Sequence, residues 1–156
     1  MGILEIRKYP DSVLRKKCES VKEITYREKA LFRDMLFTMH TFKGIGLAAP
    51  QIGIARRLMV AEIGEAVIKL ADPEIVKVKG SNKMVEGCLS LPALSVEIKR
   101  PFEIEARGLN EEGRAVEVKA KGLMARVIQH EIDHLNGKLI IDYAGLLQRM
   151  KLLIRR

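Results

Sequence analysis

Three absences narrow the possibilities for this chain of 156 residues. No apolar run approaches the roughly 18 residues that a membrane-spanning helix needs, which argues against a membrane protein. The first residues, Met1–Glu5, lack the layout of a secretory signal peptide. Two cysteines without such a signal favour a reducing compartment, and metal binding over a disulfide. We expect a cytoplasmic protein, although a cleaved organellar transit peptide would leave no trace and keeps an organelle open.

The length and net charge of the chain indicate its number of domains and the partners it could bind. At 156 residues the chain is expected to form one domain, residues 1–156, and it contains no repeat, linker or low-complexity segment. The net charge of +8 favours polyanions such as RNA. The tail Gln148–Arg156 has the pattern of a basic amphipathic helix. It could contact RNA, or it could be a terminal helix that packs Leu152 and Leu153 on the core.

Two helices are expected in the first third of the chain. A short basic helix is predicted over residues 11–18, and a longer one begins at Thr25, because Thr25 and Glu28 have the spacing of a capping box. Gly44 is the expected stop of the longer helix. Apolar residues at helical spacing predict its buried face: Phe32, Met35, Leu36 and Met39.

The middle of the chain has the pattern of strands rather than helices. Apolar residues, alternating in the last two segments, predict strands over residues 58–61, 67–71, 75–78, 102–106 and 116–120. The turn residues Asn110–Gly113 join the last two, which suggests an antiparallel hairpin. Strands in runs, with helices before and after, indicate an α+β fold. We expect antiparallel sheets around a central helix, with an N-terminal helix and a short C-terminal helix.

That central helix carries the most informative motif. Residues 122–137 have the pattern of one helix, and within it His130, Glu131 and His134 form an H-E-x-x-H element. Residues four apart lie on one face of a helix, so the two imidazoles can bind a single metal ion. Glu131 is close enough to take a proton from a water activated by that ion. Two of only three histidines fall at this spacing, which argues against the alternative of two structural histidines beside a solvated glutamate.

A catalytic site of this kind takes three protein ligands and keeps one position open for water. Known patterns that supply the third ligand downstream fail here. Gly137 matches one of them, but Ile140 stands where its histidine would be, and no glutamate follows Glu131. The third ligand must therefore lie upstream.

Three upstream residues are candidates for that ligand. Cys88 lies between a glycine and a proline in an irregular stretch that could bring backbone N–H groups near a metal, although a lone cysteine is often a small buried hydrophobe. Cys18 is expected to be a packed thiol. His40 lies in the last turn of a helix, where a partial positive charge suits the helix dipole.

Two further segments complete a larger pattern. Gly44–Gln51 is a glycine-punctuated loop, G-I-G-L-A-A-P-Q, and Glu86–Ser90 is the turn E-G-C-L-S. With the segment Q-H-E-I-D-H at residues 129–134, in this order, they closely resemble the peptide deformylase family. The resemblance runs from Ile3 to about Tyr143.

The resemblance implies three metal ligands: Cys88, His130 and His134. It also implies that Glu131 is the general acid and base, and that Gln51 and the backbone N–H of Leu89 form the oxyanion hole. The residues expected to bind substrate are Gly44, Ile45, Gly46, Glu86, Gly87, Leu89 and Val127. Of these, Val127 rests on its place in a helix stripe shared with Leu123.

The family removes the formyl group from the N-terminal formyl-methionine of new bacterial or organellar proteins and releases formate. The implied partners are N-formylmethionyl nascent polypeptides and, as a hypothesis, the ribosome surface; no membrane and no specific DNA are expected. The implied metal is Fe²⁺, with Zn²⁺, Ni²⁺ or Co²⁺ able to occupy the site. Thiolate and ferrous iron together predict sensitivity to air.

Two departures and two rival functions remain at this level. Asp72 stands where the family has asparagine, and Ala93 where glycine is frequent, which puts only local loop geometry in doubt. One rival is a metallo-aminohydrolase or peptidase of other specificity. The other is a basic RNA- or ribosome-binding protein with a structural metal, although nothing near the motifs offers the fourth protein ligand of a structural site.

Overall fold

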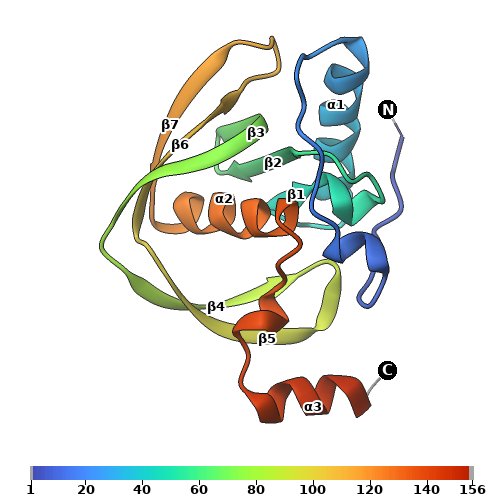
Figure 1. Cartoon of the computed structure of the whole chain (residues 1–156), viewed down its shortest axis with the longest axis vertical. Coiled ribbons are helices and arrows are strands. Elements are labelled where there is room, and N and C mark those ends of the chain that lie inside the picture. The colour runs from blue at the N-terminus through green and yellow to red at the C-terminus, as the bar shows by residue number, and fades with distance from the viewer. Residues whose placement is uncertain (1, 155–156) are drawn as a thin grey trace.

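The computed structural model describes the backbone of residues 2–154 and the side chains of residues 2–151. It has the predicted α+β fold, in which antiparallel sheets surround the central helix α2 (Figure 1). The elements follow the order η1 (Ser12–Arg15), α1 (Tyr26–Thr41), β1 (Gly46–Ala48), η2 (Ala49–Ile52), β2 (Leu58–Ile63), β3 (Ala66–Lys79), β4 (Asn82–Cys88), β5 (Leu91–Arg100), β6 (Glu103–Leu109), β7 (Ala115–Lys121), α2 (Gly122–Leu135), η3 (Ile140–Tyr143) and α3 (Leu146–Ile154).

Two sheets enclose the helix. The larger has the strand order β1-β2-β3-β6-β7, and the smaller pairs β4 with β5; all pairings are antiparallel. Helix α2 contacts all five strands of the larger sheet, and Figure 1 shows β4 and β5 on its other side. The first part of the chain, including α1, covers the far side of β1 and β2. Among the described residues no helix is long and apolar enough to cross a membrane.

Helix α1 begins as predicted and ends differently. Thr25 is the N-cap and forms a complete capping box with Glu28, and most of the predicted apolar face is fully buried. The helix ends at Thr41, and the residue with left-handed backbone is Lys43, with φ of 59°, rather than Gly44. Backbone N–H groups of Lys43 and Gly44 return to His40 O and Met39 O, at 3.0 and 2.9 Å, which is the hydrogen-bond pattern of a Schellman motif.

The prediction of a helix over residues 11–18 was wrong. Only a single 3₁₀ turn, η1, forms there; Asp11 caps it by accepting a hydrogen bond from Val13 N, and Lys16 is already extended. Cys18 N donates to Leu135 O at 3.1 Å, a tie that draws the chain away from helical geometry. The Cys18 side chain is buried as expected, and burial raises the pKa of its thiol to about 11.

Several strands extend beyond the predictions. The two segments predicted over 67–71 and 75–78 belong to one strand, β3, whose pairing with β6 contains two register irregularities. Asp72 lies at the first of them with φ of 50°, and its carboxylate accepts a hydrogen bond from Val21 N at 2.8 Å. The strands β1, β4 and β5 were not predicted. The hairpin of β6 and β7 around Asn110–Gly113 was predicted correctly.

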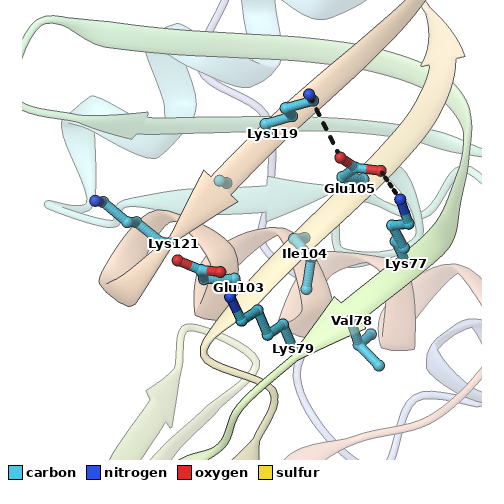
Figure 2. Close-up of a pocket in the computed structure, with 9 residues that line it drawn as sticks. Lys77, Val78, Lys79, Glu103, Ile104, Glu105, Lys119 and Lys121 are labelled. Carbon is cyan, nitrogen blue, oxygen red and sulfur yellow. Dashed lines mark ion pairs between the residues drawn. The ribbon is translucent and has the colours of Figure 1, made fainter.

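The outer face of the larger sheet carries rows of alternating charge. Lys77, Glu105 and Lys119 lie opposite one another on β3, β6 and β7, with ion-pair distances of 3.9 and 3.6 Å. Lys79, Glu103 and Lys121 form a second row beside a hollow of about 390 Å³ (Figure 2). Opposite charges on neighbouring strands stabilise this exposed face modestly.

Candidate active site

Helix α2 supplies most of the site. Glycines with positive φ lie at both of its ends, Gly122 at 62° and Gly137 at 74°, and its buried residues include Val127 and Ile128. Leu123 lies on the same stripe as Val127 and His130, as predicted, but it is not buried against a sheet: the residue is 42% exposed and lines a cleft with them. That end of the helix faces the cleft rather than a sheet.

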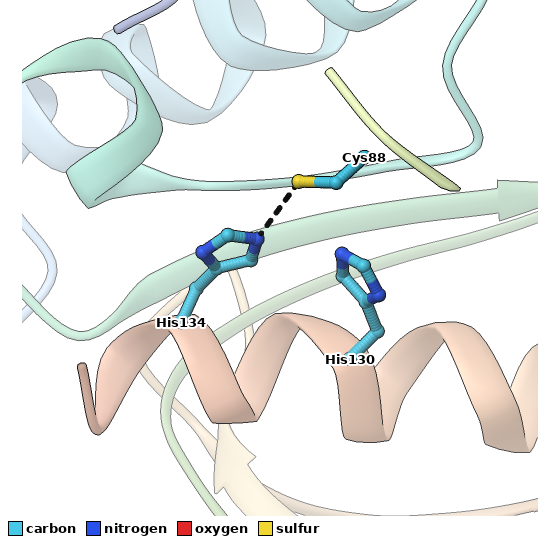
Figure 3. Close-up of side chains that lie close together, drawn as sticks. All are labelled: Cys88, His130 and His134. Atoms are coloured by element: carbon cyan, nitrogen blue, oxygen red, sulfur yellow. Dashed lines mark hydrogen bonds between the residues drawn. The ribbon is translucent and has the colours of Figure 1, made fainter. Parts of the chain in front are cut away.

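Cys88 and the two histidines come together at one point. Cys88 lies at the end of β4, and its Sγ is 3.4 Å from His134 Nε2. The ligand atoms of Cys88, His130 and His134 all lie within 4.8 Å of one another. Figure 3 shows the sulfur above the helix, facing both rings. Of the three candidates for a third ligand, the structure brings only Cys88 to the histidines. Cys18 packs with Ala48 and Leu135, and His40 pairs with Glu62 at 2.5 Å on the surface.

The donor set fits a divalent metal ion. Burial holds the pKa of His134 well below its usual value, so this ring is neutral and can donate a lone pair. Burial also lowers the pKa of His130, but Glu131, Cys88 and Glu86 outweigh it, and the pKa is raised. The same negative groups that favour a proton on His130 would also favour a metal cation bound there instead of the proton. One thiol and two imidazoles suit iron, zinc, nickel or cobalt better than magnesium or calcium.

Glu86 anchors His130 from behind. Its Oε1 lies 2.9 Å from His130 Nδ1, and its Oε2 accepts hydrogen bonds from Arg100 Nε at 2.6 Å and Arg126 Nη1 at 2.5 Å. Burial alone would raise the pKa of Glu86, but the hydrogen bonds from His130 and Arg100 lower it to about 2. The carboxylate is therefore charged, and it leaves Nε2 of His130 to face the sulfur.

The network continues away from the cleft. Arg100 Nη1 donates to Asp133 Oδ2 at 2.9 Å, and the Tyr143 hydroxyl donates to the same oxygen at 2.6 Å. Arg100, Asp133, Tyr143 and Arg126 were not identified from the sequence. Arg126 offered a signal, since it is a cation one turn before His130 on an apolar helix face. Arg100 offered none, because a terminal strand residue of this type is usually exposed.

Glu131 is the buried acid of the site. Burial raises its pKa to about 7, although His130 and Arg100 oppose the shift. Its Oε1 has no hydrogen-bond partner among the described residues. Gly46 of β1 lies directly against the carboxylate, where any Cβ would collide with Glu131 and Val127. A carboxyl group with this pKa can both accept and return a proton near neutral pH.

Gln51 and Leu89 both border Cys88 in the cleft. Gln51 Oε1 accepts a hydrogen bond from Ala48 N at 3.0 Å, which fixes the amide so that Nε2 points to Ser90 Oγ at 3.2 Å and Cys88 Sγ at 3.6 Å. Gln51 is buried, whereas Leu89 is half-buried. The amide thus presents an N–H donor beside the sulfur.

Residues 7–9 tie these two segments together. Arg7 N donates to Gln51 O at 2.7 Å, and Tyr9 N donates to Ser90 O at 2.8 Å. Between them, Lys8 Nζ donates to Leu89 O at 3.1 Å. We call residues 7–9 the N-terminal strap. It holds the turn after Cys88 at a fixed place relative to η2.

A cleft of about 560 Å³ opens onto these groups. Its lining includes Cys88, His130, Glu131 and Gln51. It also includes all residues expected to bind substrate, namely Gly44, Ile45, Gly46, Glu86, Gly87, Leu89 and Val127. The hollow on the outer sheet face (Figure 2) is lined by neither cysteine nor histidine. The chemistry therefore belongs to the cleft.

Comparison with known proteins gives consistent matches. The family model described as polypeptide deformylase matches residues 3–150. A peptide deformylase of Clostridium botulinum is 49% identical over 142 residues, which cover 91% of this chain and 97% of that protein. One of Thermodesulfovibrio yellowstonii is 46% identical over 154 residues, covering 96% and 93%.

Solved structures agree with the sequence matches. A peptide deformylase from Legionella pneumophila superposes with a TM-score of 0.94 at 38% identity, covering 98% of this chain and 92% of that one. One from Ehrlichia chaffeensis in complex with actinonin gives 0.96 at 34% identity, covering 99% and 96%.

Proposed function

Since the chain belongs to the polypeptide deformylase family, we propose that Cys88, His130 and His134 bind one divalent metal ion and that Glu131 is the general base and acid. The protein is a hydrolase that removes the N-formyl group of newly synthesised proteins and releases formate. One observation supports the assignment of roles: the three ligand atoms lie within 4.8 Å of one another, beside a cleft that Cys88, His130, Glu131 and Gln51 line.

The chemistry follows from the side chains around the cleft. When bound, the metal ion supplies Lewis acidity, which lowers the pKa of a water molecule. Glu131, with a pKa of about 7, takes the proton of the attacking water and delivers it to the departing amine. Attack on the formyl carbon leaves negative charge on its oxygen. The Gln51 amide and the backbone N–H of Leu89 stabilise that charge as fixed donors.

The apolar part of the cleft suits a methionine side chain. Ile45, Leu89 and Val127 offer apolar walls, and Gly46 offers its backbone close to Glu131. Gly44 and Gly87 let the substrate backbone approach the same wall. Together these residues would hold the formyl group over the ligand cluster.

The metal itself is proposed to be Fe²⁺, with Zn²⁺, Ni²⁺ or Co²⁺ able to replace it. A thiolate ligand makes the site soft, and it also makes the iron form vulnerable to oxidation. We expect the iron-loaded protein to lose activity in air while the nickel-loaded protein keeps it longer. Equal half-lives of the two forms in air would contradict this.

The proposed place of action is the cytoplasm, on N-formylmethionyl chains that emerge from the ribosome. The net charge of +8 supports a transient association with ribosomal RNA. No binding to DNA of a particular sequence is proposed.

The deciding experiment is formate release from a formyl-methionyl peptide by anaerobically purified protein. Glu131→Gln keeps the size of the side chain but removes the proton acceptor, and we expect it to lower kcat by about 10²–10⁴-fold with the metal content unchanged. A Glu131→Gln protein as active as the wild type would overturn the role of Glu131. Faster cleavage of free peptides than of formyl peptides would instead favour the rival peptidase.

A further inference from the structure

Lys43 occupies a backbone position that a lysine rarely takes. It follows the C-cap of α1 with φ of 59°, in the left-handed region, and the Schellman hydrogen bonds around it make glycine the favoured residue there. A side chain held in such a conformation carries strain, and strain of this kind concentrates at functional sites. The Lys43 side chain lines the active-site cleft.

A second lysine lines the same wall. Lys8 Nζ donates to Leu89 O at 3.1 Å. Gly44, which follows Lys43, packs on the Leu89 side chain so closely that a Cβ there would lie 3.0 Å from Leu89 Cδ1. Lys8 therefore contacts Leu89, the residue expected to stabilise the developing oxyanion, and Lys43 directly precedes the glycine that packs against it.

No acidic side chain of the cleft offsets these two charges. Among the lining residues only Glu86 and Glu131 are acidic. Glu86 is buried and its carboxylate is bound by Arg100 and Arg126, and Glu131 is buried beneath Gly46. Within the described part of the chain, Lys43 forms no ion pair. The mouth of the cleft is therefore positive, between otherwise apolar walls.

We infer that Lys43, assisted by Lys8, is a specificity-determining residue that favours substrates with an aspartate or glutamate at the first or second position after the formyl-methionine. The formyl group must reach the Cys88 and histidine cluster, so the rest of the substrate leaves past Leu89 toward the two lysines. A carboxylate there gains an attraction that a neutral side chain lacks. The inference rests on the proposed function, because it assumes a formyl peptide in this cleft.

The test compares peptides that differ at one residue, with aspartate and asparagine as the isosteric pair. Formyl-Met-X-Ala and formyl-Met-Ala-X are prepared with X as aspartate, asparagine or lysine, all with amidated C-termini, since a free terminal carboxylate would mimic the proposed ligand. We expect kcat/KM for the aspartate peptide to exceed that of the asparagine peptide by roughly threefold to tenfold at low salt for at least one position, and the ratio to shrink at about 0.5 M salt. A ratio of one or less at both positions overturns the inference.

Variants of Lys43 separate charge from structure. Lys43→Asn removes the charge but tolerates the left-handed backbone, and it should bring the aspartate to asparagine ratio close to one. Lys43→Glu should invert the preference in favour of the lysine peptide. Lys29→Ala, at an exposed lysine of helix α1 outside the cleft, is the control and should keep the wild-type ratio.

Two outcomes remain distinct. If no formyl peptide yields formate, the proposed function fails. If all six peptides are deformylated and Lys43→Asn leaves the ratio unchanged, only the role of Lys43 fails. A rise in melting temperature of Lys43→Gly together with loss of the preference would support the view that the strain at residue 43 serves recognition.

Discussion

At the scale of single residues, Gln51 has two tasks that use opposite ends of its amide. Its oxygen holds Ala48 N, while its nitrogen is the donor that faces Cys88 Sγ and Ser90. The side chain is buried, so its orientation is fixed before substrate arrives. Such a preorganised donor contributes more to catalysis than a mobile one.

Gln51→Glu tests the donor without removing the acceptor. The carboxylate can still accept from Ala48 N, but it brings negative charge where the oxyanion forms. We expect kcat to fall by at least about 10²–10³-fold, the usual effect of losing one such donor, with a smaller change in KM. Steady-state formate release measures both, and circular dichroism checks the fold. A variant with unchanged kcat would remove Gln51 from the oxyanion hole.

The charged carboxylate of Glu86 is buried and binds two arginine side chains and His130. Its side chain is 6% exposed, and those of Arg100 and Arg126 are 5% and 4% exposed. Glu86→Gln would remove the buried carboxylate that Arg100 and Arg126 share, and Arg100 alone would still be paired with Asp133. We expect a loss of about 3–5 kcal/mol in the free energy of unfolding, measured in urea. Glu117→Gln, which alters an exposed pair with Arg107, should change it by less than about 1 kcal/mol.

The same change should loosen the metal site. Without the carboxylate behind it, His130 loses the group that fixes its ring, and the metal affinity should fall by about 10–100-fold. Competition with a chelator measures this on the folded protein. An affinity equal to that of the wild type would show that His130 is held by its other contacts.

Much of the site could be predicted from the sequence, because several of its residues lie close together in the chain. His130, Glu131 and His134 lie on one helix, so their spacing alone predicts their geometry. Cys88 is 42 positions before His130, and only the combination of motifs connected them. Arg100 could not be predicted, because its burial depends on how β5 crosses α2, which no local pattern encodes.

At the scale of elements, α1 is the clearest agreement between sequence and structure. Thr25 Oγ1 donates to Glu28 Oε1 at 2.6 Å, and Arg56 Nη1 binds the other oxygen at 2.7 Å. The hydrogen bonds from Thr25 and Arg56 lower the pKa of Glu28 to about 2. The lowered pKa means that the charged carboxylate stabilises the fold fully above about pH 4.5, and that this stability is lost as the pH falls toward 2.

Thr25→Ala should therefore act in two ways. We expect it to lower the free energy of unfolding by about 1 kcal/mol at pH 7, through loss of the cap. It should also flatten the dependence of stability on pH between about 4.5 and 2, because the pKa of Glu28 returns toward its ordinary value. Thr41→Ala, at the exposed end of the same helix, serves as the control. Parallel stability curves for wild type and Thr25→Ala would contradict this.

The strands show where local patterns stop being sufficient. β6 and β7 alternate and were predicted, whereas β5 was overlooked although Leu94, Val96 and Ile98 alternate with exposed residues. The sequence of β1 contains no alternating pattern that could have predicted it. Gly46 is needed there because a side chain would collide with Glu131, and not because glycine favours strands. A three-residue strand built around that contact can be recognised only in three dimensions.

At the scale of the whole molecule, the C-terminal helix α3 is a basic segment that lies apart from the rest of the fold. Helix α3 lies beyond the small sheet (Figure 1), with Leu146, Leu147 and Met150 exposed. The predicted packing of Leu152 and Leu153 on the core lies outside the described side chains. A helix with both basic and exposed apolar residues is suited to a polyanionic surface that also offers apolar contacts.

Truncation after Leu147 tests this segment. We expect weaker co-sedimentation with ribosomes at low salt, since the removed residues carry a cluster of basic side chains, while turnover of a short formyl peptide is retained. The salt dependence of co-sedimentation should become shallower as well. Unchanged co-sedimentation would assign any ribosome affinity to another face.

The N-terminal strap has a consequence for how the enzyme fails on heating. Beside the direct hydrogen bond from Gln51 Nε2 to Ser90 Oγ, hydrogen bonds from Arg7, Lys8 and Tyr9 join η2 to the turn after Cys88, and chain ends detach more readily than cores. Detachment would loosen both halves of the proposed oxyanion hole together, without melting either sheet. Thermal inactivation should accordingly precede the cooperative loss of ellipticity, leaving over some degrees a protein that is intact by spectroscopy yet catalytically silent.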